Sequence, residues 1–190
     1  MKRGQNKNGF TIVELLIVIV VIGILAAITV VAFNGIQQRA TNNSIAQTAN
    51  SWMKALKLYK ADNGQWPNYW TCLGEGYLYG VTGTDPSGTA QCRLTGSTGY
   101  TETTAFKNLM RPYFNNGSLP TPTFVTADGG TEWRRGIHYA FGGGSGTDVY
   151  MQVVYRGDVG ACPGLQGVAG TKTLWSGNSM CHYTFGSTTG

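Results

Sequence analysis

The chain has 190 residues and a formal net charge of +5, and charged residues make up only 12% of it. Lys2, Arg3 and Lys7 lie in the first nine residues, and the rest of the chain carries 11 basic and 9 acidic residues. This near balance excludes a nucleic-acid-binding protein that relies on bulk positive charge. The low charge and the 28 glycines are unusual for a cytosolic enzyme and favour a loop-rich, extracellular β domain.

The N-terminal part of the chain contains one long, mainly apolar run at residues 10–33. About 20 apolar residues are enough for a helix to span a bilayer, so the run predicts a transmembrane helix. Glu14 is its only ionisable side chain. Because an acid inside lipid is costly, Glu14 is predicted to be functional and to have a partner.

Three interpretations compete for this N-terminal segment. A secretory signal peptide has an apolar core of about 7 to 15 residues, and this run is longer and carries a carboxylate near its start. A plain membrane anchor accounts for the length and, by the positive-inside rule, for the basic residues before it. If the segment is a plain anchor, Glu14 has no partner. It would lie about one helical turn from the interface, and its side chain would extend to the lipid headgroups.

The third interpretation rests on the motif Gly9-Phe10-Thr11-Ile12-Val13-Glu14. This motif resembles the type IV pilin and pseudopilin family, whose precursors have a short basic leader ending in Gly, then Phe-Thr-x-x-Glu and a long apolar run. The resemblance covers residues 3–33. It implies a leader peptide at residues 1–9, cleavage between Gly9 and Phe10, N-methylation of Phe10, and assembly through Phe10, Thr11 and Glu14. In this family the acid is expected to meet the N-terminal ammonium of a neighbouring subunit.

The resemblance also implies partners and a location. The partners are a prepilin peptidase, an inner-membrane assembly platform, membrane lipid before assembly, and further copies in a helical filament. The chain would sit in the cytoplasmic (inner) membrane with its N-terminus inside, and later in an extracellular pilus at the cell surface. No enzymatic activity, cofactor or metal is expected. The alternatives are a pseudopilin of a type II-like secretion system and a membrane-anchored adhesin or DNA-binding minor pilin.

One departure from the family pattern concerns a proline. Many members carry a proline about two-thirds along the apolar run, whereas this chain has Val30-Val31 there. Any kink would therefore have to use Gly23 or Asn34-Gly35, because sharp kinks need a cause such as proline or glycine.

Residues 34–63 are predicted to form the amphipathic half of the same helix. Apolar residues recur there at helical spacing, at Ile45, Ala49, Trp52, Leu56 and Tyr59. Gly64 and Pro67 predict the helix end, and Asn42-Asn43-Ser44 are weak helix formers that could produce a local defect. Residues 59–67 resemble the Tyr-x-x-Asn-Gly-x-Tyr-Pro segment of pilins and major pseudopilins, with Trp66 replacing Tyr. We favour a helix cap and a core contact here over a subunit contact.

The four cysteines lie in the expected extracytoplasmic, β-rich domain at residues 64–190. They contain no C-x2-C pair, so disulfides are favoured over zinc. Of the three ways of pairing them, we favour Cys72–Cys92 and Cys162–Cys181, because each closes a local loop of about 20 residues.

The predicted elements of this domain follow in chain order. Residues 68–102 suggest a disulfide-closed loop region with short strands. A short helix is predicted at residues 102–110, before Pro112, and an extended connector at residues 119–122. Strands are predicted at residues 136–141, 148–156 and 181–185, the first two as an antiparallel hairpin around a glycine loop. The expected fold class is α+β and pilin-like, with a long helix packed on a small antiparallel sheet and disulfide-stapled loops.

Candidates for catalysis and metal binding are few. His138 and His182 are the only histidines, and both lie in predicted strands, which favours a structural role. Asp128, Asp148 and Asp158 are scattered candidates for a calcium site. Such a site needs several oxygen ligands that converge, and spacing alone does not predict convergence.

Trp133, Arg134 and Arg135 form the one candidate for DNA or surface contact. An aromatic ring beside arginine suits single-stranded nucleic acid. Two arginines are a small charge, however, and the same residues could form a salt bridge or cover the edge of a core. Nucleic acid is therefore not the expected partner.

Overall fold

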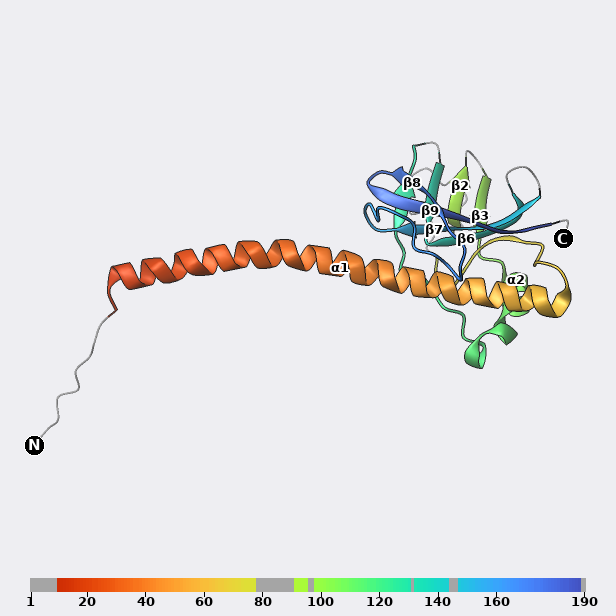
Figure 1. Ribbon diagram of the computed structural model, residues 1–190, viewed down its shortest axis with the longest axis horizontal. Coiled ribbons are helices and arrows are strands. Elements are labelled where there is room, and N and C mark those ends of the chain that lie inside the picture. The colour runs from red at the N-terminus through yellow and green to blue at the C-terminus, as the bar shows by residue number, and fades with distance from the viewer. Residues whose placement is uncertain (1–9, 78–90, 96–97, 131, 144–146, 189–190) are drawn as a thin grey trace, which may run out of the picture. The chain divides into compact units, whose positions relative to one another are not determined.

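The computed structural model describes residues 10–77, 91–95, 98–130, 132–143 and 147–188. Its elements divide between two compact units, residues 1–39 and residues 40–190, which are described separately below. The longest element, α1 (Ile12–Asn63), contributes to both units, and the strands belong to the second (Figure 1).

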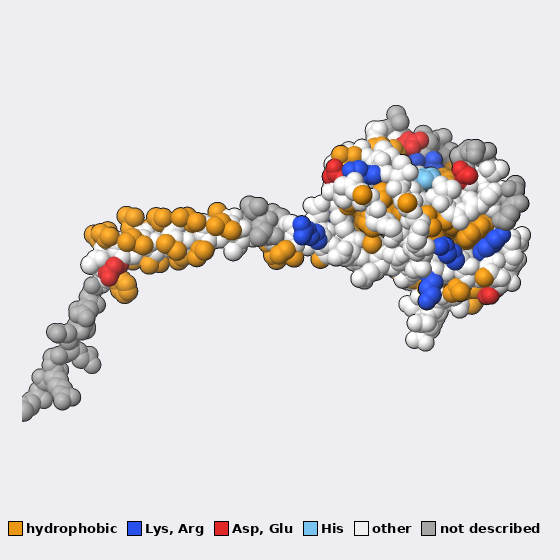
Figure 2. Space-filling view, in the orientation of Figure 1, with side chains coloured by type: hydrophobic (Ala, Val, Ile, Leu, Met, Phe, Trp, Pro, Cys, Tyr) orange, Lys and Arg blue, Asp and Glu red, His pale blue; other side chains and the backbone are white. Residues whose placement is uncertain are grey.

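In the first unit, α1 begins with a segment that is almost entirely apolar. The segment Ile12–Thr29 has a mean hydropathy of 3.0, and none of it is buried. Figure 2 shows hydrophobic side chains covering this part of the helix. By length and composition the segment can cross a bilayer, which would shield these side chains from water.

In the second unit, α1 buries one face. Ile45, Ala49, Trp52 and Leu56 are almost completely buried, and Tyr59 is nearly so, as the predicted stripe requires. The three weak helix formers from Asn42 remain helical. The side chain of Asn42 accepts a hydrogen bond from the Arg156 backbone N–H (2.8 Å) and donates one to the Arg156 carbonyl oxygen (2.9 Å).

The C-terminal end of α1 is closed by glycine. Gly64 has φ +74°, a left-handed conformation that glycine adopts without strain, and its N–H donates to the Lys60 carbonyl oxygen at 2.9 Å. Trp66 follows and is nearly buried. Its ring packs edge-to-face with the Phe185 ring, and the two ring centroids are 5.1 Å apart. The segment therefore contains a helix cap and a core contact.

The first sheet has five antiparallel strands in the order β1-β6-β7-β9-β8. Their bounds are β1 (Trp70–Cys72), β6 (Ile137–Gly143), β7 (Asp148–Tyr155), β9 (Asn178–Ser187) and β8 (Thr171–Trp175). Tyr139, Met151 and Tyr183 project from this sheet into the same apolar cluster as Trp52 of α1. The Trp52 ring also donates from Nε1 to the Pro120 carbonyl oxygen at 2.8 Å.

The second sheet has four antiparallel strands in the order β3-β2-β5-β4. These are β3 (Thr98–Thr101), β2 (Gln91–Thr95), β5 (Glu132–Arg135) and β4 (Thr126–Asp128). The short helix α2 (Thr104–Met110) and two 3-10 turns, η1 (Arg111–Tyr113) and η2 (Asn115–Gly117), lie between β3 and β4 along the chain. The α+β class is confirmed, but the expectation of one small sheet is wrong, since the described domain holds two.

The predicted strands are present with shifted bounds. The hairpin of β6 and β7 pairs Tyr139 with Met151 and Ile137 with Val153. β6 extends through Gly142 and Gly143, which were expected in the loop, while residues 144–146 of that loop lie outside the described residues. The strand expected at residues 181–185 is the middle of the ten-residue β9.

Disulfides join Cys72 to Cys92 and Cys162 to Cys181, the two pairs favoured from the sequence. The first of these links β1 of one sheet to β2 of the other.

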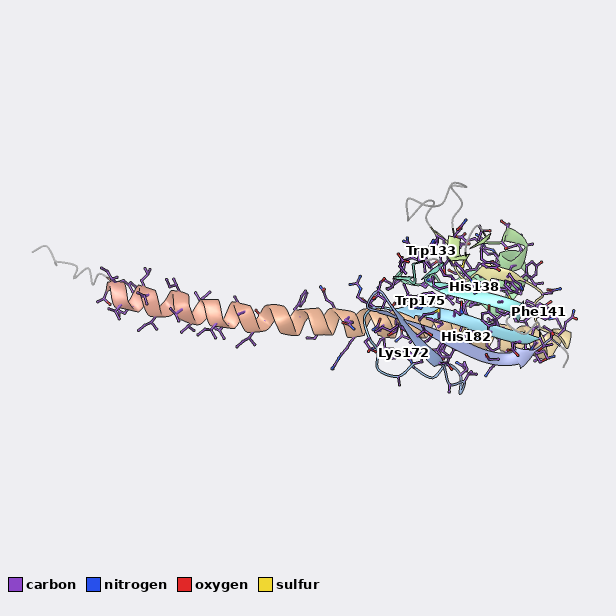
Figure 3. All side chains as sticks on the ribbon, turned by 90° about the horizontal axis from the view of Figure 1, so that it is seen from above. Trp133, His138, Phe141, Lys172, Trp175 and His182 are labelled. Carbon is purple, nitrogen blue, oxygen red and sulfur yellow. A yellow bond between two sulfur atoms is a disulfide. The ribbon has the colours of Figure 1, made fainter. Side chains whose placement is uncertain are left out.

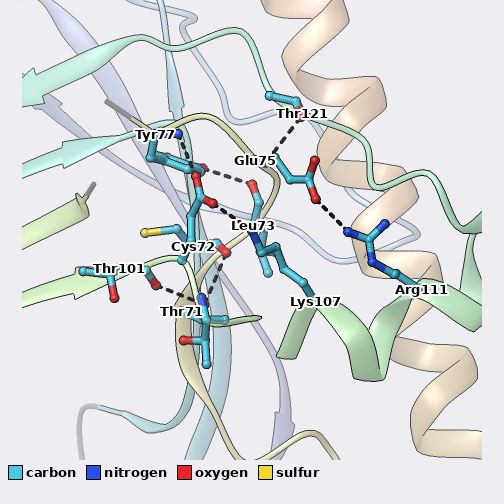
Figure 4. A network of polar contacts seen from close by, with 11 residues as sticks. Thr71, Cys72, Leu73, Glu75, Tyr77, Thr101, Lys107, Arg111 and Thr121 are labelled. Carbon is cyan, nitrogen blue, oxygen red and sulfur yellow. Dashed lines mark hydrogen bonds and ion pairs between the residues drawn. The ribbon is translucent and has the colours of Figure 1, made fainter. Parts of the chain in front are cut away.

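A network of polar contacts holds the segment after β1 (Figure 4). The buried Tyr77 hydroxyl accepts a hydrogen bond from the Ile137 N–H (2.9 Å) and donates to the Leu73 carbonyl oxygen (3.0 Å). Arg111 forms an ion pair with Glu75 at 3.0 Å. These bonds tie the segment to β6 and to the turn after α2.

Candidate functional site

The start of α1 forms a capping box between Thr11 and Glu14. The Thr11 N–H donates to Glu14 Oε2 at 2.9 Å, and the Glu14 N–H donates to Thr11 Oγ1 at 3.2 Å. The Thr11 hydroxyl also donates to Glu14 Oε2, at 2.8 Å. These reciprocal bonds satisfy backbone donors that the first turn of a helix otherwise leaves unpaired. Glu14 is therefore fixed at the N-terminal edge of the apolar segment.

The cap uses only one of the two carboxylate oxygens. Within the described part of the chain, the hydrogen bonds to the Glu14 side chain all go to Oε2. Oε1 can therefore accept a further donor without breaking the cap. The sequence pattern Thr-x-x-Glu carries the capping signal, but the sequence analysis assigned Thr11 to assembly alone and missed its role in the cap.

The other polar side chain within Ile12–Thr29 is satisfied within the helix. Thr29 donates from Oγ1 to the Ala26 carbonyl oxygen at 2.9 Å, a bond that survives transfer into lipid. Phe10, which precedes the cap, is 84% exposed. Gly9 and the predicted leader lie outside the described residues.

A family model described as the prokaryotic N-terminal methylation motif matches residues 4–30. This match includes Lys7 of the leader, Gly9-Phe10 and the capping box; the last two are features that separate a prepilin from a plain anchor. The N-terminal third of this chain is similar to that of type IV pilins and pseudopilins. Members of this family are structural proteins rather than enzymes.

The relatives of this pilin-like chain carry two kinds of name. It is 35% identical over 65 residues to the type II secretion system core protein G of Klebsiella michiganensis, covering 34% of this chain and 46% of the relative. It is 40% identical over 63 residues to the fimbrial protein EcpC of Eikenella corrodens, covering 33% and 41%. A fimbrial protein of Neisseria meningitidis serogroup A is 35% identical over 68 residues, covering 36% and 40%.

These matches have a limited extent. The chain spans under half the length of the curated relatives it matches. No solved structure matches the chain. The similarity to named pilins therefore concerns about a third of the chain. The description of the two-sheet domain rests on the structure alone.

At Trp133, Arg134 and Arg135 the structure favours the salt bridge and core-edge role over the candidate surface contact. Trp133 is 6% exposed and Arg134 is 3% exposed, so neither presents its ring or guanidinium to a ligand outside the domain. Arg134 pairs with Glu132 at 2.8 Å and lies over the Trp175 ring at 5.3 Å. The half-buried Arg135 lies over the Phe124 ring at 5.0 Å.

The aspartates considered for calcium have local roles. Asp128 accepts from the Gly130 N–H, and Asp158 accepts from the Gly160 N–H and pairs with Lys172. These hydrogen bonds and the ion pair lower the pKa of Asp158, the Lys172 contact most. Across residues 10–77, 91–95, 98–130, 132–143 and 147–188, no three His, Cys, Asp or Glu side chains gather as a metal ion would require.

Proposed function

We propose that this chain is a structural subunit of a type IV pilus, cut after Gly9 by a prepilin peptidase and assembled through its N-terminal helix. The observation that carries the proposal is the single carboxylate of Glu14, held at the start of an exposed apolar helix with one oxygen that accepts no hydrogen bond from the described residues. Cleavage would place the new ammonium of Phe10 one residue before the cap. N-methylation of Phe10 would keep that charge.

Pairing with this ammonium gives Glu14 the partner that a membrane setting demands. In lipid, an isolated carboxylate and an isolated ammonium are both costly, and pairing recovers part of the desolvation cost of each. The neighbouring subunit in a filament supplies such an ammonium. Because the apolar run has no proline, the register of neighbouring helices would depend strongly on this one contact.

The proposed location follows from the same features. The basic leader would hold the N-terminus on the cytoplasmic side of the inner membrane, and the domain beyond the helix would lie outside. Both disulfides fit an oxidising compartment. Adhesion and motility are activities such a filament could serve at the cell surface.

A second candidate is a pseudopilin of a type II-like secretion system, favoured by the relatives named core protein G. The two functions share the N-terminal chemistry, so substitutions at Glu14 do not separate them. Electron microscopy of cells expressing the chain does. Long surface filaments containing this chain support the pilus, whereas short filaments formed only together with a secretion apparatus support the pseudopilin.

The capping box allows a direct test of the ion pair. Glu14→Gln keeps both halves of the box, because glutamine also serves at this position, but removes the charge. Glu14→Ala removes the charge and the bonds to the carboxylate, leaving only the backbone bond from residue 14 to Thr11 Oγ1, and Thr11→Val removes the hydroxyl while keeping the charge. We expect Glu14→Gln and Glu14→Ala each to abolish most filament yield with normal membrane insertion, and Thr11→Val to reduce the yield only modestly.

Filament yield is measured by shearing cells and blotting the sheared and membrane fractions for the chain. If Glu14→Gln assembles at the wild-type level while Glu14→Ala fails, the carboxylate acts only as a helix cap and the pairing proposal is wrong. A chain with Glu14→Gln that is missing from the membrane fraction would indicate an insertion defect instead.

A further inference from the structure

The two sheets of the C-terminal unit meet through a polar layer as well as through apolar contacts. Arg134 of β5 donates from Nε to Gln152 Oε1 of β7 at 3.0 Å. Gln152 Nε2 in turn lies 3.2 Å from His182 Nδ1 of β9. This chain of contacts runs from the second sheet into the first. We call the side chains of Arg134, Gln152, His182 and His138 the polar layer.

His138 is the most constrained member of the polar layer. It pairs in register with Gln152, which pairs with His182, so the three side chains form a row across β6, β7 and β9. Figure 3 labels the two histidines on the first sheet. His138 is 1% exposed and packs against the Tyr100 ring at 5.1 Å. Within the described chain neither of its ring nitrogens has a hydrogen-bond partner, which is unusual for a buried polar group.

The charges that act on His138 are all positive. Burial contributes most, followed by Arg93, Arg134 and His182, and together they hold the pKa of His138 well below its usual range. Burial also lowers the pKa of His182, although Asp148 opposes this shift. At neutral pH both rings are therefore neutral, and a proton on His138 would add a third positive charge beside two guanidinium groups.

The other groups facing the polar layer offer little compensation. Glu132 of β5 is engaged by Arg134, and the Tyr150 hydroxyl of β7 accepts a hydrogen bond from Arg93 of β2 at 3.0 Å. Asp128 of β4 is exposed and accepts a hydrogen bond from the Gly130 N–H in the turn that follows the strand. Lys172 of β8 pairs in register with Cys181 and so points to the opposite face. Tyr100 of β3 and the β1 residues Trp70, Thr71 and Cys72 bring no charge.

Most of the first-sheet residues of the apolar core lie on the other face of that sheet. Six of these alternate along the strands with the polar layer and belong to one cluster with α1: Ile137, Tyr139, Met151, Val153, Cys181 and Tyr183. Since successive side chains of a strand point to opposite faces, these six side chains face away from the polar layer, and the second sheet adds Ala127 of β4 to the same cluster. The Cys72–Cys92 disulfide covalently links the second sheet to the first.

We propose that the polar layer is an acid-sensitive device, in which protonation of His138 beside Arg93 and Arg134 loosens the second sheet from the first. The second sheet then opens on its disulfide tether while α1 and the first sheet stay packed. Neutral pH closes it again.

The size of the response follows from proton linkage. The closed form disfavours the proton, so opening is promoted as the pH falls below the ordinary histidine pKa of 6.5, and the effect grows until the pKa of the closed form is reached. One histidine that titrates normally in the open form and stays neutral in the closed form raises the opening constant about 25-fold between pH 7 and pH 5.

Hydrogen exchange followed by mass spectrometry tests the device on the full chain in detergent micelles. At pH 5, after correction for the intrinsic exchange rate, we expect amides of β2 and β5 to exchange about 25-fold faster than at pH 7. Amides of α1 beyond residue 40 and of β7 should keep their protection.

The chain has only two histidines, which gives matched controls. His138→Phe fills the site without a titrating group and should remove the acid response, whereas His182→Gln keeps an amide beside Gln152 and should leave most of it. If His138→Phe does not fold at pH 7, His138→Gln serves instead. Equal protection of β2 and β5 at both pH values, an acid response that persists without His138, or loss of protection in α1 at the same pH would each overturn the proposal.

Discussion

Removing each disulfide separately should destabilise the C-terminal unit by a similar amount. The bonds close loops with sequence separations of 20 and 19 residues. For loops of this size, the chain-entropy estimate gives about 11 cal/mol/K, or about 3 kcal/mol at 25 °C, for either bond. Cys72→Ala with Cys92→Ala empties two fully buried positions, whereas only Cys181 of the other pair is fully buried, so we expect the first pair to cost about 1 kcal/mol more.

Urea unfolding of the full chain in detergent, followed by tryptophan fluorescence, measures this loss. All five tryptophans lie at residue 52 or later, so the signal reports on the C-terminal unit. A loss of about 3 kcal/mol should lower the melting temperature by about 6 to 12 °C for a unit of this size. A loss below about 1 kcal/mol for either pair would refute the chain-entropy reasoning, and a larger loss for Cys162→Ala with Cys181→Ala would refute the packing argument.

Two further substitutions test the helix and its end. Trp52→Phe removes the bond to the Pro120 carbonyl oxygen and leaves a small void, so the free energy of unfolding should fall by about 2 kcal/mol in the same urea assay; an unchanged midpoint would contradict this. Gly64→Ala should cost about 1 kcal/mol, because φ is +74° and a new Cβ meets no atom within 4 Å, which leaves backbone strain as the only cost. Gly64→Asn is the matched control and should cost less; equal losses would show that strain is not the cause.

Much of the second unit could be predicted because its signals are local. The buried stripe of α1 follows from helical spacing, and the hairpin of β6 and β7 follows from runs of β-branched and aromatic residues. The disulfide pairs follow from the short loops they close. The end of α1 follows from Gly64, since glycine readily adopts the left-handed conformation found there.

The second sheet could not be predicted because its strands are short and its two halves meet through a long-range pairing. β2 pairs with β5 across a gap of more than 30 residues, and β4 and β5, which pair locally, have only three and four residues. In the first sheet, the edge strand β8 could not be predicted either, because it is mostly exposed and lacks an apolar alternation. For Arg134 the sequence left a surface contact and a salt bridge at a core edge both open; the structure shows it buried, with Glu132, Gln152 and the Trp175 ring around its charge.

The N-terminal site also has a part that the sequence predicts and a part that the structure adds. The motif from Gly9 to Glu14 predicts processing and assembly because it is dense and contiguous. The capping box adds a physical reason for Thr11 at that spacing, and it separates two roles of the Glu14 carboxylate, one within the helix and one toward a neighbour.

The mass of the mature chain tests the central claim most directly. The chain is purified from membranes and from sheared filaments of cells that contain a prepilin peptidase, and its N-terminus is read by intact and peptide mass spectrometry. The account predicts a chain that begins at Phe10 and carries one N-methyl group. An intact Met1, or a chain cut after about Ala32 as a signal peptide would be, would contradict it.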